Sequence, residues 1–389
     1  MREAPAPLWT VPFALAFVAN FADGLALALY LHLPGYLSDL GASERMIGLV
    51  FGVMSGAAIV IRPPAGRVMD RWGRRPVILV GCALHVVACS LYLTVDAIDA
   101  WLFLVRCLQG LAQGMLFSSL FTYAADIVPP SRRTEGIGLF GVSGMVPLAL
   151  GPLVGDLILA HGTYRDLFWF SVAVSVLALL ASLGLRDVPR SSEVGGGFFK
   201  AARQRDLMPI WMLGSCFAAV VAAIFTFLKR FIDDEHVGSV GLFFACYAAT
   251  AVALRVLFGW VPDRVGPTRV LYPALASFAC AVLLLSIARD VVVLGAAGVA
   301  AGFGHGYAFP ILSALVVDRA HPADRGSAMS LFTAVFDAGV LVGSPILGAI
   351  AEATDFRTMF LCSAVAPIGG GLAFGLWERA LRADVPSSS

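Results

Sequence analysis

The hydrophobic positions of this chain gather into long runs that are separated by short polar breaks. An α-helix needs about 20 consecutive apolar residues to cross the hydrocarbon core of a bilayer. Runs of this length predict transmembrane helices over residues 9–34, 46–66, 76–95, 100–122, 137–160, 166–185, 209–231, 239–260, 270–288, 291–315, 327–351 and 357–377. The expected fold class is an all-α membrane protein with twelve transmembrane helices.

The composition fits a chain that lies mostly in lipid. It is 59% hydrophobic and 14% charged, whereas soluble domains carry about 25% charged residues. A formal net charge of +1 leaves no broad basic surface, so no nucleic-acid partner is expected. The seven cysteines fall inside apolar runs without a C-x-x-C pair, which predicts free thiols, no metal site and no cofactor.

The widest polar break follows the sixth predicted helix and reads RDVPRSSEVGGGFFKAARQRDLMP. We interpret it as a cytoplasmic linker over residues 186–208. It would join an N-terminal six-helix bundle, residues 1–185, to a C-terminal six-helix bundle, residues 209–389. Its FFKAARQRD stretch has the composition of a short amphipathic helix that lies on the membrane surface.

The basic residues predict the orientation of the chain. Short cytoplasmic loops of membrane proteins carry an excess of Lys and Arg. If the N-terminus is inside, the cytoplasmic segments hold 18 of the 27 basic residues and the outer segments hold 6. Both termini are therefore predicted to be cytoplasmic. Arginine outnumbers lysine 25 to 2, a bias that suggests a high-GC bacterium and hence the inner membrane.

The two predicted bundles share an internal repeat. Shifting the chain by 193 positions lays IGLVFGVMSGAAIVIRPPAGRVMDRWG on VGLFFACYAATAVALRVLFGWVPDRVG without a gap. Gly66, Asp70 and Gly73 of the first copy then fall on Gly259, Asp263 and Gly266 of the second. Internal duplication of this kind is typical of secondary transporters, which move solutes without consuming ATP.

Three stretches resemble motifs of the major facilitator superfamily. GRVMDRWGRR matches the signature G-x-x-x-D-R-x-G-R-R between helices 2 and 3, and RCLQGLAQG is similar to the helix 4 motif R-x-x-Q-G-x-x-x-G. GVSGMVPLALGPLVGD resembles the helix 5 motif of the family's antiporters, through Gly144, Pro147, Gly151, Pro152 and Gly155. Asp156 departs from that motif, where a small residue is usual. The resemblance implies two bundles that alternate access to a central site, and its helix 5 motif favours export.

In the resembled family the first motif forms a latch between the two bundles. The residues to which this role is carried over are Gly66, Asp70, Arg71, Gly73, Arg74, Arg75 and Asp126, with Asp263 and Arg264 in the second copy. Glycines would allow a tight turn, Asp70 would cap a helix N-terminus, and the arginines would bond carboxylates such as Asp126. The alternative is a simple determinant of topology, because positive charge favours the cytoplasmic side.

A few polar residues lie inside the predicted helices, where charges are costly and usually functional. Asp23 follows Asn20 by three residues, so both share one face of the first helix. Arg106, Gln109 and Gln113 form one stripe of the fourth helix. We hypothesise that Asp23 is the proton-coupling acid and that Arg106 tunes it, with a structural interhelical hydrogen bond as the alternative.

The second half offers fewer candidates for the cavity. His305 and Tyr307 lie on the predicted tenth helix, where His305 could titrate near neutral pH or simply bond a neighbouring helix. Asp337 lies in the eleventh helix, which packs against the second helix in the resembled fold. We expect Asp337 to lock the two halves, with substrate contact as the alternative.

Together these features predict a proton-coupled exporter of small organic molecules, either drug-like compounds or a secreted metabolite. The expected partners are this substrate, protons and the lipid bilayer, and we expect a monomer. The alternatives are an uptake carrier or facilitator for a sugar or other small metabolite, and a non-transporting membrane sensor. No catalytic triad and no P-loop lysine is present, so an enzyme is not expected.

Overall fold

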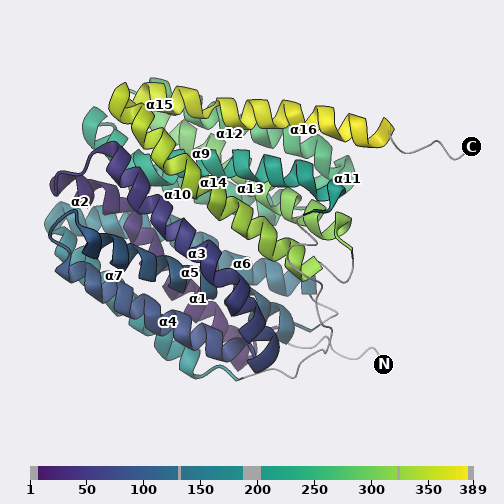
Figure 1. The fold of residues 1–389 in the computed structure, drawn as a ribbon, viewed down its shortest axis with the longest axis horizontal. Coiled ribbons are helices and arrows are strands. Elements are labelled where there is room, and N and C mark those ends of the chain that lie inside the picture. The colour runs from purple at the N-terminus through teal and green to yellow at the C-terminus, as the bar shows by residue number, and fades with distance from the viewer. Residues whose placement is uncertain (1–7, 130–132, 187–202, 322–324, 384–389) are drawn as a thin grey trace, which may run out of the picture. The chain divides into compact units, whose positions relative to one another are not determined.

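A computed structural model describes residues 8–129, 133–186, 203–321 and 325–383 of the chain (Figure 1). All regular structure in these ranges is helical. Twelve helical segments within them are long and apolar enough to cross a membrane, which confirms the predicted fold class. The amphipathic helix predicted near residue 200 lies largely outside the described residues.

The chain divides into two compact units, which are residues 1–41 with 53–192, and residues 42–52 with 193–389. The helices before the linker are α1 (Val11–Leu29), α2 (Leu33–Asp39), α3 (Glu44–Trp72), α4 (Arg74–Leu91), α5 (Ala100–Ile127), α6 (Arg133–His161) and α7 (Tyr164–Leu183). Short 3₁₀ segments, η1 (Tyr30–His32) and η2 (Tyr92–Thr94), continue α1 and α4.

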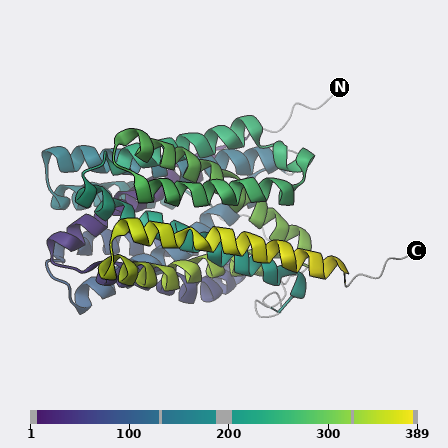
Figure 2. The ribbon, with the colours of Figure 1, turned by 90° about the horizontal axis from the view of Figure 1, so that it is seen from above.

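The helices after the linker belong to the second unit. They are α9 (Met208–Glu235), α10 (Val240–Phe258), α11 (Val261–Val265), α12 (Pro267–Ile287), α13 (Val291–Arg319), α14 (Arg325–Ala353), α15 (Phe356–Ser363) and α16 (Val365–Ala383). A 3₁₀ turn, η4 (Arg205–Leu207), precedes α9. The two views show α15 and α16 following one another along one direction, as two parts of a single span (Figures 1 and 2).

Polar side chains fix where several helices begin. The Asp99 carboxylate accepts hydrogen bonds from the amides of Trp101 and Leu102 at 3.0 and 3.3 Å, and Asp290 caps α13 in the same way. A carboxylate at this position accepts hydrogen bonds from amides that have no partner within the helix. Its negative charge is also stabilised by the positive end of the helix dipole. The polar breaks of the sequence therefore act as helix caps.

The loop predicted between the second and third helices is shorter than expected. α3 continues through Pro63 and Pro64 to Trp72, so Gly66 lies within a helix and makes no turn. The break is confined to Gly73, whose φ of 98° favours glycine because a side chain would be strained there. Gly266, its counterpart in the repeat, has φ of 101°, so the two units share the same break.

Glycines allow the helices of each unit to pack closely. A Cβ atom on Gly110 of α5 would strike the carbonyl oxygen of Met54 in α3. A Cβ atom on Gly302 of α13, which is 192 residues after Gly110, would strike the carbonyl oxygen of Tyr247 in α10 in the same way. Inside a bilayer no hydrophobic driving force holds helices together, so their packing depends on small residues that let the backbones approach closely. The internal repeat is therefore also a repeat of helix contacts.

Replacing Gly110 with alanine is expected to lower the melting temperature of the detergent-solubilised protein. The new Cβ would meet the Met54 backbone and come within 2.9 Å of the Ala57 Cβ, and overpacking of this kind costs about 1–3 kcal/mol. Gly141→Ala in α6 is the matched control, because no atom lies within 4 Å of that position. Alanine stabilises a helix relative to glycine, so equal melting temperatures for the two variants would contradict this packing.

Candidate functional site

Three polar side chains meet inside the first unit, and we call them the Asp23–His85 site. An oxygen of Asp23, on α1, lies 2.6 Å from Nδ1 of His85, on α4. Gln113 of α5 donates a hydrogen bond to the same oxygen at 3.2 Å. The three residues are 6%, 1% and 9% exposed, respectively, so an ionisable pair is enclosed by three membrane-spanning helices.

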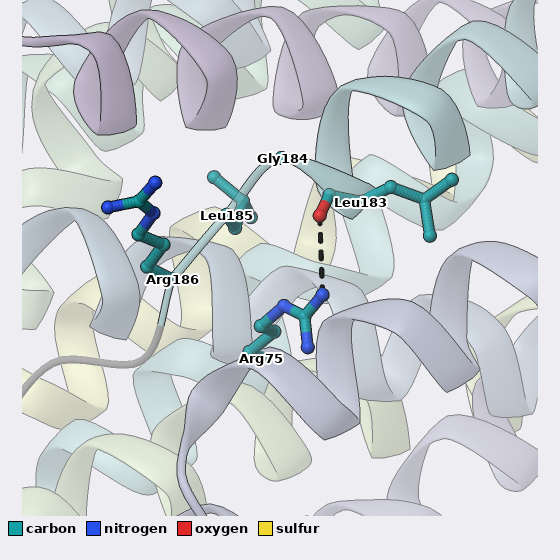
Figure 3. A pocket seen from close by; sticks show the side chains of 5 residues that line it. All are labelled: Arg75, Leu183, Gly184, Leu185 and Arg186. Atoms are coloured by element: carbon teal, nitrogen blue, oxygen red, sulfur yellow. Dashed lines mark hydrogen bonds between the residues drawn. The ribbon is translucent and has the colours of Figure 1, made fainter.

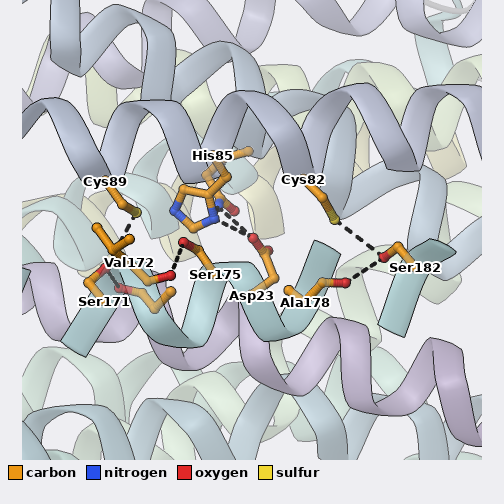
Figure 4. A network of polar contacts seen from close by, with 11 residues as sticks. Asp23, Cys82, His85, Cys89, Ser171, Val172, Ser175, Ala178 and Ser182 are labelled. Atoms are coloured by element: carbon orange, nitrogen blue, oxygen red, sulfur yellow. Dashed lines mark hydrogen bonds and ion pairs between the residues drawn. The ribbon is translucent and has the colours of Figure 1, made fainter. Parts of the chain in front are cut away.

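Small and polar residues around the site let the helices approach and satisfy its neighbours. Buried alanines flank Asp23 on α1, at Ala19, Ala22 and Ala26. Cys82 and Cys89 lie one turn on either side of His85 on α4 and contact Ser182 and Ser171 of α7 at 3.4 and 3.3 Å. Figure 4 shows that these polar contacts extend along the interface between α4 and α7.

The hydrogen-bond partners described for the Asp23 carboxylate are His85 and Gln113, and the tuning role expected of Arg106 stays a prediction. Arg106 instead donates a hydrogen bond to Gln109 at 2.6 Å and contacts the Tyr92 hydroxyl at 3.5 Å. It lies seven residues before Gln113, about 10 Å farther along the α5 axis. All three members of the predicted α5 stripe are buried, but they serve two separate clusters.

His85 was missed in the sequence analysis although a signal for it is present. Cys82, His85 and Cys89 recur at i, i+3 and i+7, so a titratable residue and two thiols share one face of a helix. An imidazole on such a stripe predicts a buried polar contact. Which carboxylate it meets depends on how α1 and α4 pack, and the sequence of α4 alone does not contain that information.

The predicted helix 5 motif lies on α6 and packs along α1. An added Cβ on Gly144 would lie 3.6 Å from the Asn20 amide nitrogen, and one on Gly151 would lie 2.5 Å from the Cβ of Ala28. A Cβ on Gly24 of α1 would lie 3.3 Å from Pro147, and one on Gly155 would overlap the ring of His32. Asn20 also donates a hydrogen bond to Ser143 at 2.8 Å. The motif therefore forms the surface against which the helix that carries Asp23 rests.

His32 explains the one departure from this motif. Its ring is buried, with Nε2 at 3.1 Å from the carbonyl oxygen of Pro152 and at 3.6 Å from a carboxylate oxygen of Asp156. An acidic residue at position 156 thus faces a histidine of η1, the segment that follows α1. The motif residues leave room for this ring, since a side chain on Gly155 would overlap it.

The predicted latch is described in part. Arg74 lies with Nε at 2.9 Å from an Asp126 carboxylate oxygen and donates from Nη1 to the carbonyl oxygen of Met69, at the end of α3, at 2.9 Å. Arg71 is exposed, and the Arg264 guanidinium stacks 4.8 Å from the centre of a Trp260 ring. The side chains of Asp70 and Asp263 lie outside the described part of the chain, so a latch remains a prediction.

Comparison with known proteins identifies the family. Residues 13–289 and 235–389 match the sequence profile of the Major Facilitator Superfamily. This chain belongs to that family. It is therefore a multi-pass membrane transporter and not an enzyme, in agreement with the twelve spans.

Relatives of this family member are similar along nearly their whole length. An uncharacterized MFS-type transporter of Burkholderia mallei (strain SAVP1) is 27% identical over 383 residues, which cover 95% of this chain and 92% of the relative. The staphylopine export protein of Staphylococcus aureus (strain Mu50 / ATCC 700699) is 23% identical over 376 residues, with coverage of 90% and 92%.

Solved structures share the fold. The nucleoside transporter NupG has a TM-score of 0.78 at 16% identity, covering 94% of this chain and 99% of that chain. The human organic anion transporter MFSD10 has a TM-score of 0.72 at 19% identity, with the same two coverages. At these identities the likeness concerns the MFS fold alone.

The second unit of this MFS transporter holds a cluster around His305 that is more aromatic than the Asp23–His85 site. His305 of α13 bonds the hydroxyl of Tyr247 in α10, and its ring lies 5.1 Å from the ring of Phe217 and 6.4 Å from that of Phe278. Phe278 corresponds to His85 at the shift of 193 positions, and His305 corresponds to Gln113 at a shift of 192, the same shift that relates Gly110 to Gly302. A polar site in the first unit thus has a largely aromatic counterpart in the second.

The other two candidates of the second unit have different surroundings. Tyr307 donates a hydrogen bond to the Phe258 carbonyl oxygen at 3.1 Å, so its hydroxyl caps the end of α10. Asp337 is half-buried on α14, and its role in locking the halves stays a prediction.

Removing the Asp23 carboxylate is expected to destabilise the first unit. Asp23→Ala leaves two buried donors without their acceptor, at a cost of about 1–3 kcal/mol, and should lower the melting temperature in detergent. Adding His85→Phe, which copies Phe278 of the second unit, removes one stranded polar ring and should restore part of the loss. Additive effects of the two substitutions would contradict a direct interaction.

Proposed function

We propose that this MFS transporter exports small organic molecules in exchange for protons. The observation that carries the proposal is the buried Asp23–His85 pair, with 2.6 Å between its oxygen and nitrogen atoms. Ionisable groups inside membrane-spanning helices are expensive to bury and mark ion or proton pathways. Both side chains of the pair are almost fully buried.

The chemistry of the pair suits proton exchange. Gain or loss of one proton changes the charge of the pair by one unit, and a net charge in an apolar bundle is costly. The two protonation states therefore favour different arrangements of the helices that enclose them. Substrate binding to one arrangement and proton binding to the other would couple the two movements.

The contacts between α1 and α6 connect this pair to the transport cycle. Asp23 lies on the same helix whose neighbouring turns rest on Gly144, Pro147 and Gly151. A movement of α6 that carried α1 with it would displace the Asp23 carboxylate relative to His85 on α4. In the MFS this α6 motif is associated with antiport, which supports coupling of proton release to a change of accessibility.

Export is supported by this motif and by one relative. A similar protein of Staphylococcus aureus carries the name staphylopine export protein. We propose a drug-like compound or a secreted metabolite as substrate, the bacterial inner membrane as location and the monomer as working unit. Arg74 and Asp126 would contribute to a latch that opens and closes with each cycle.

The proposal predicts that Asp23→Asn abolishes proton exchange while the protein still inserts and folds. The measurement uses inside-out vesicles with an imposed proton gradient, a pH-sensitive dye, and a panel of cationic drugs, metal chelators, sugars and amino acids. The wild type should dissipate the gradient with one class of compound, and the variant should respond to none. This result would also identify the substrate class.

The matched control is Asp99→Asn, because Asp99 is an exposed N-cap of α5 and asparagine caps a helix equally well. Wild-type exchange by Asp23→Asn would remove Asp23 from the coupling role. No gradient response to any compound from folded wild-type protein would contradict proton coupling and favour a facilitator.

A further inference from the structure

A small basic pocket lies where α7 ends and α4 begins (Figure 3). Its volume is about 470 Å³, and it is lined by Arg75, Leu183, Gly184, Leu185 and Arg186. Two of these five residues are arginines and none is acidic. None of its lining residues belongs to the Asp23–His85 site.

A side-chain hydrogen bond positions Arg75, whereas only the backbone is fixed at Arg186. Arg75 donates a hydrogen bond from Nη2 to the Leu183 carbonyl oxygen at 3.3 Å, as the dashed line in Figure 3 shows. The backbone at Arg186 is fixed by the buried hydroxyl of Tyr123, which donates to its carbonyl oxygen at 2.9 Å and accepts from its amide at 3.4 Å. One guanidinium comes from α4, and the other comes from the segment after α7.

The pocket lies at the boundary of the membrane-spanning segments. The span of α4 begins at Arg74, and the span of α7 ends at Leu183. Leu177, Leu180 and Leu183 lead away from the pocket along one face of α7 and are 50%, 59% and 52% exposed. An exposed leucine face on a membrane-spanning helix is suited to contact with acyl chains.

We propose that this pocket binds the phosphate group of an anionic phospholipid. Arg75 and Arg186 would contact the phosphate oxygens, as arginine does through its several N–H donors. The acyl chains would follow the leucine face of α7. Basic pockets between transmembrane helices are suited to anionic headgroups, and the predicted orientation places this one in the cytoplasmic leaflet. Bound lipid would hold the start of α4 to the end of α7.

A free phosphate ion offers the same oxygens to the arginines, but it has nothing to place on the leucine face. The two ligands are therefore distinguished by whether acyl chains are needed. This difference decides the design of the experiment.

The test is thermal unfolding of the full-length protein in detergent, titrated in parallel with phosphatidylglycerol, with phosphatidylcholine of the same acyl chains, and with inorganic phosphate. Phosphatidylglycerol should raise the melting temperature more than phosphatidylcholine, and inorganic phosphate should have little effect. Native mass spectrometry should count the phosphatidylglycerol molecules that remain bound.

The variants are Arg75→Gln, Arg186→Gln and both together. Each basic residue near an anionic membrane surface contributes about 1 kcal/mol, so each single change should weaken phosphatidylglycerol binding about fivefold and the pair about 30-fold. Arg186→Gln keeps the test valid if the double variant fails to fold, because the Arg186 side chain is exposed and Tyr123 holds only its backbone.

The matched control is Arg165→Gln, which removes an exposed arginine at the opposite end of α7. It should leave phosphatidylglycerol binding unchanged. Equal stabilisation by the two lipids, or equal losses in Arg165→Gln and Arg186→Gln, would overturn the proposal. Stabilisation by inorganic phosphate equal to that by phosphatidylglycerol would overturn the lipid as the ligand.

Discussion

A carboxyl group enclosed by apolar helices must find hydrogen-bond partners, and the first unit is organised around the partners of Asp23. Its oxygen is bonded by His85 and Gln113 from two other helices. Leaving such a group without a partner inside a bilayer costs several kcal/mol. The contact therefore links α1, α4 and α5, and under the proposed function a change in the number of bound protons would alter how they pack.

The rest of the unit makes that contact possible. Glycines of α6 bring its backbone close to α1, while Gly110 allows α5 to pack tightly on α3. The second unit repeats this framework at Gly302, but there Phe217 and Phe278 surround His305. The same framework thus supports an ionisable site in one unit and an aromatic cluster in the other.

Much of this arrangement could be predicted from the sequence, because a bilayer imposes strict demands on chain length and polarity. The twelve spans follow from apolar runs, and the family follows from motifs such as GRVMDRWGRR. The burial of Asp23, Arg106, Gln109 and Gln113 also follows, since polar residues within a span avoid lipid. These predictions depend on periodicity and composition, which are local properties of the sequence.

The partners of these residues depend on tertiary packing and were harder to predict. Charge alone suggested Arg106 for Asp23, but Arg106 lies two turns away from Gln113 along α5 and bonds Gln109 instead. The importance of His85 depends on which face α4 turns toward α1. The contact of His32 with the helix 5 motif depends on the space that Gly155 leaves for its ring, which only the packing reveals. One sequence fixes helix faces loosely, so pairings across helices remain open until the packing is known.

In the proposed cycle, Asp23 takes up and releases the transported proton. Infrared difference spectroscopy on the purified, membrane-reconstituted protein tests it directly, by following the carbonyl band of a protonated carboxylic acid as substrate is added. We predict a substrate-dependent loss of that band in the wild type and its absence in Asp23→Asn. The same band change in wild type and variant would assign the proton to another group and exclude Asp23 as the proton carrier.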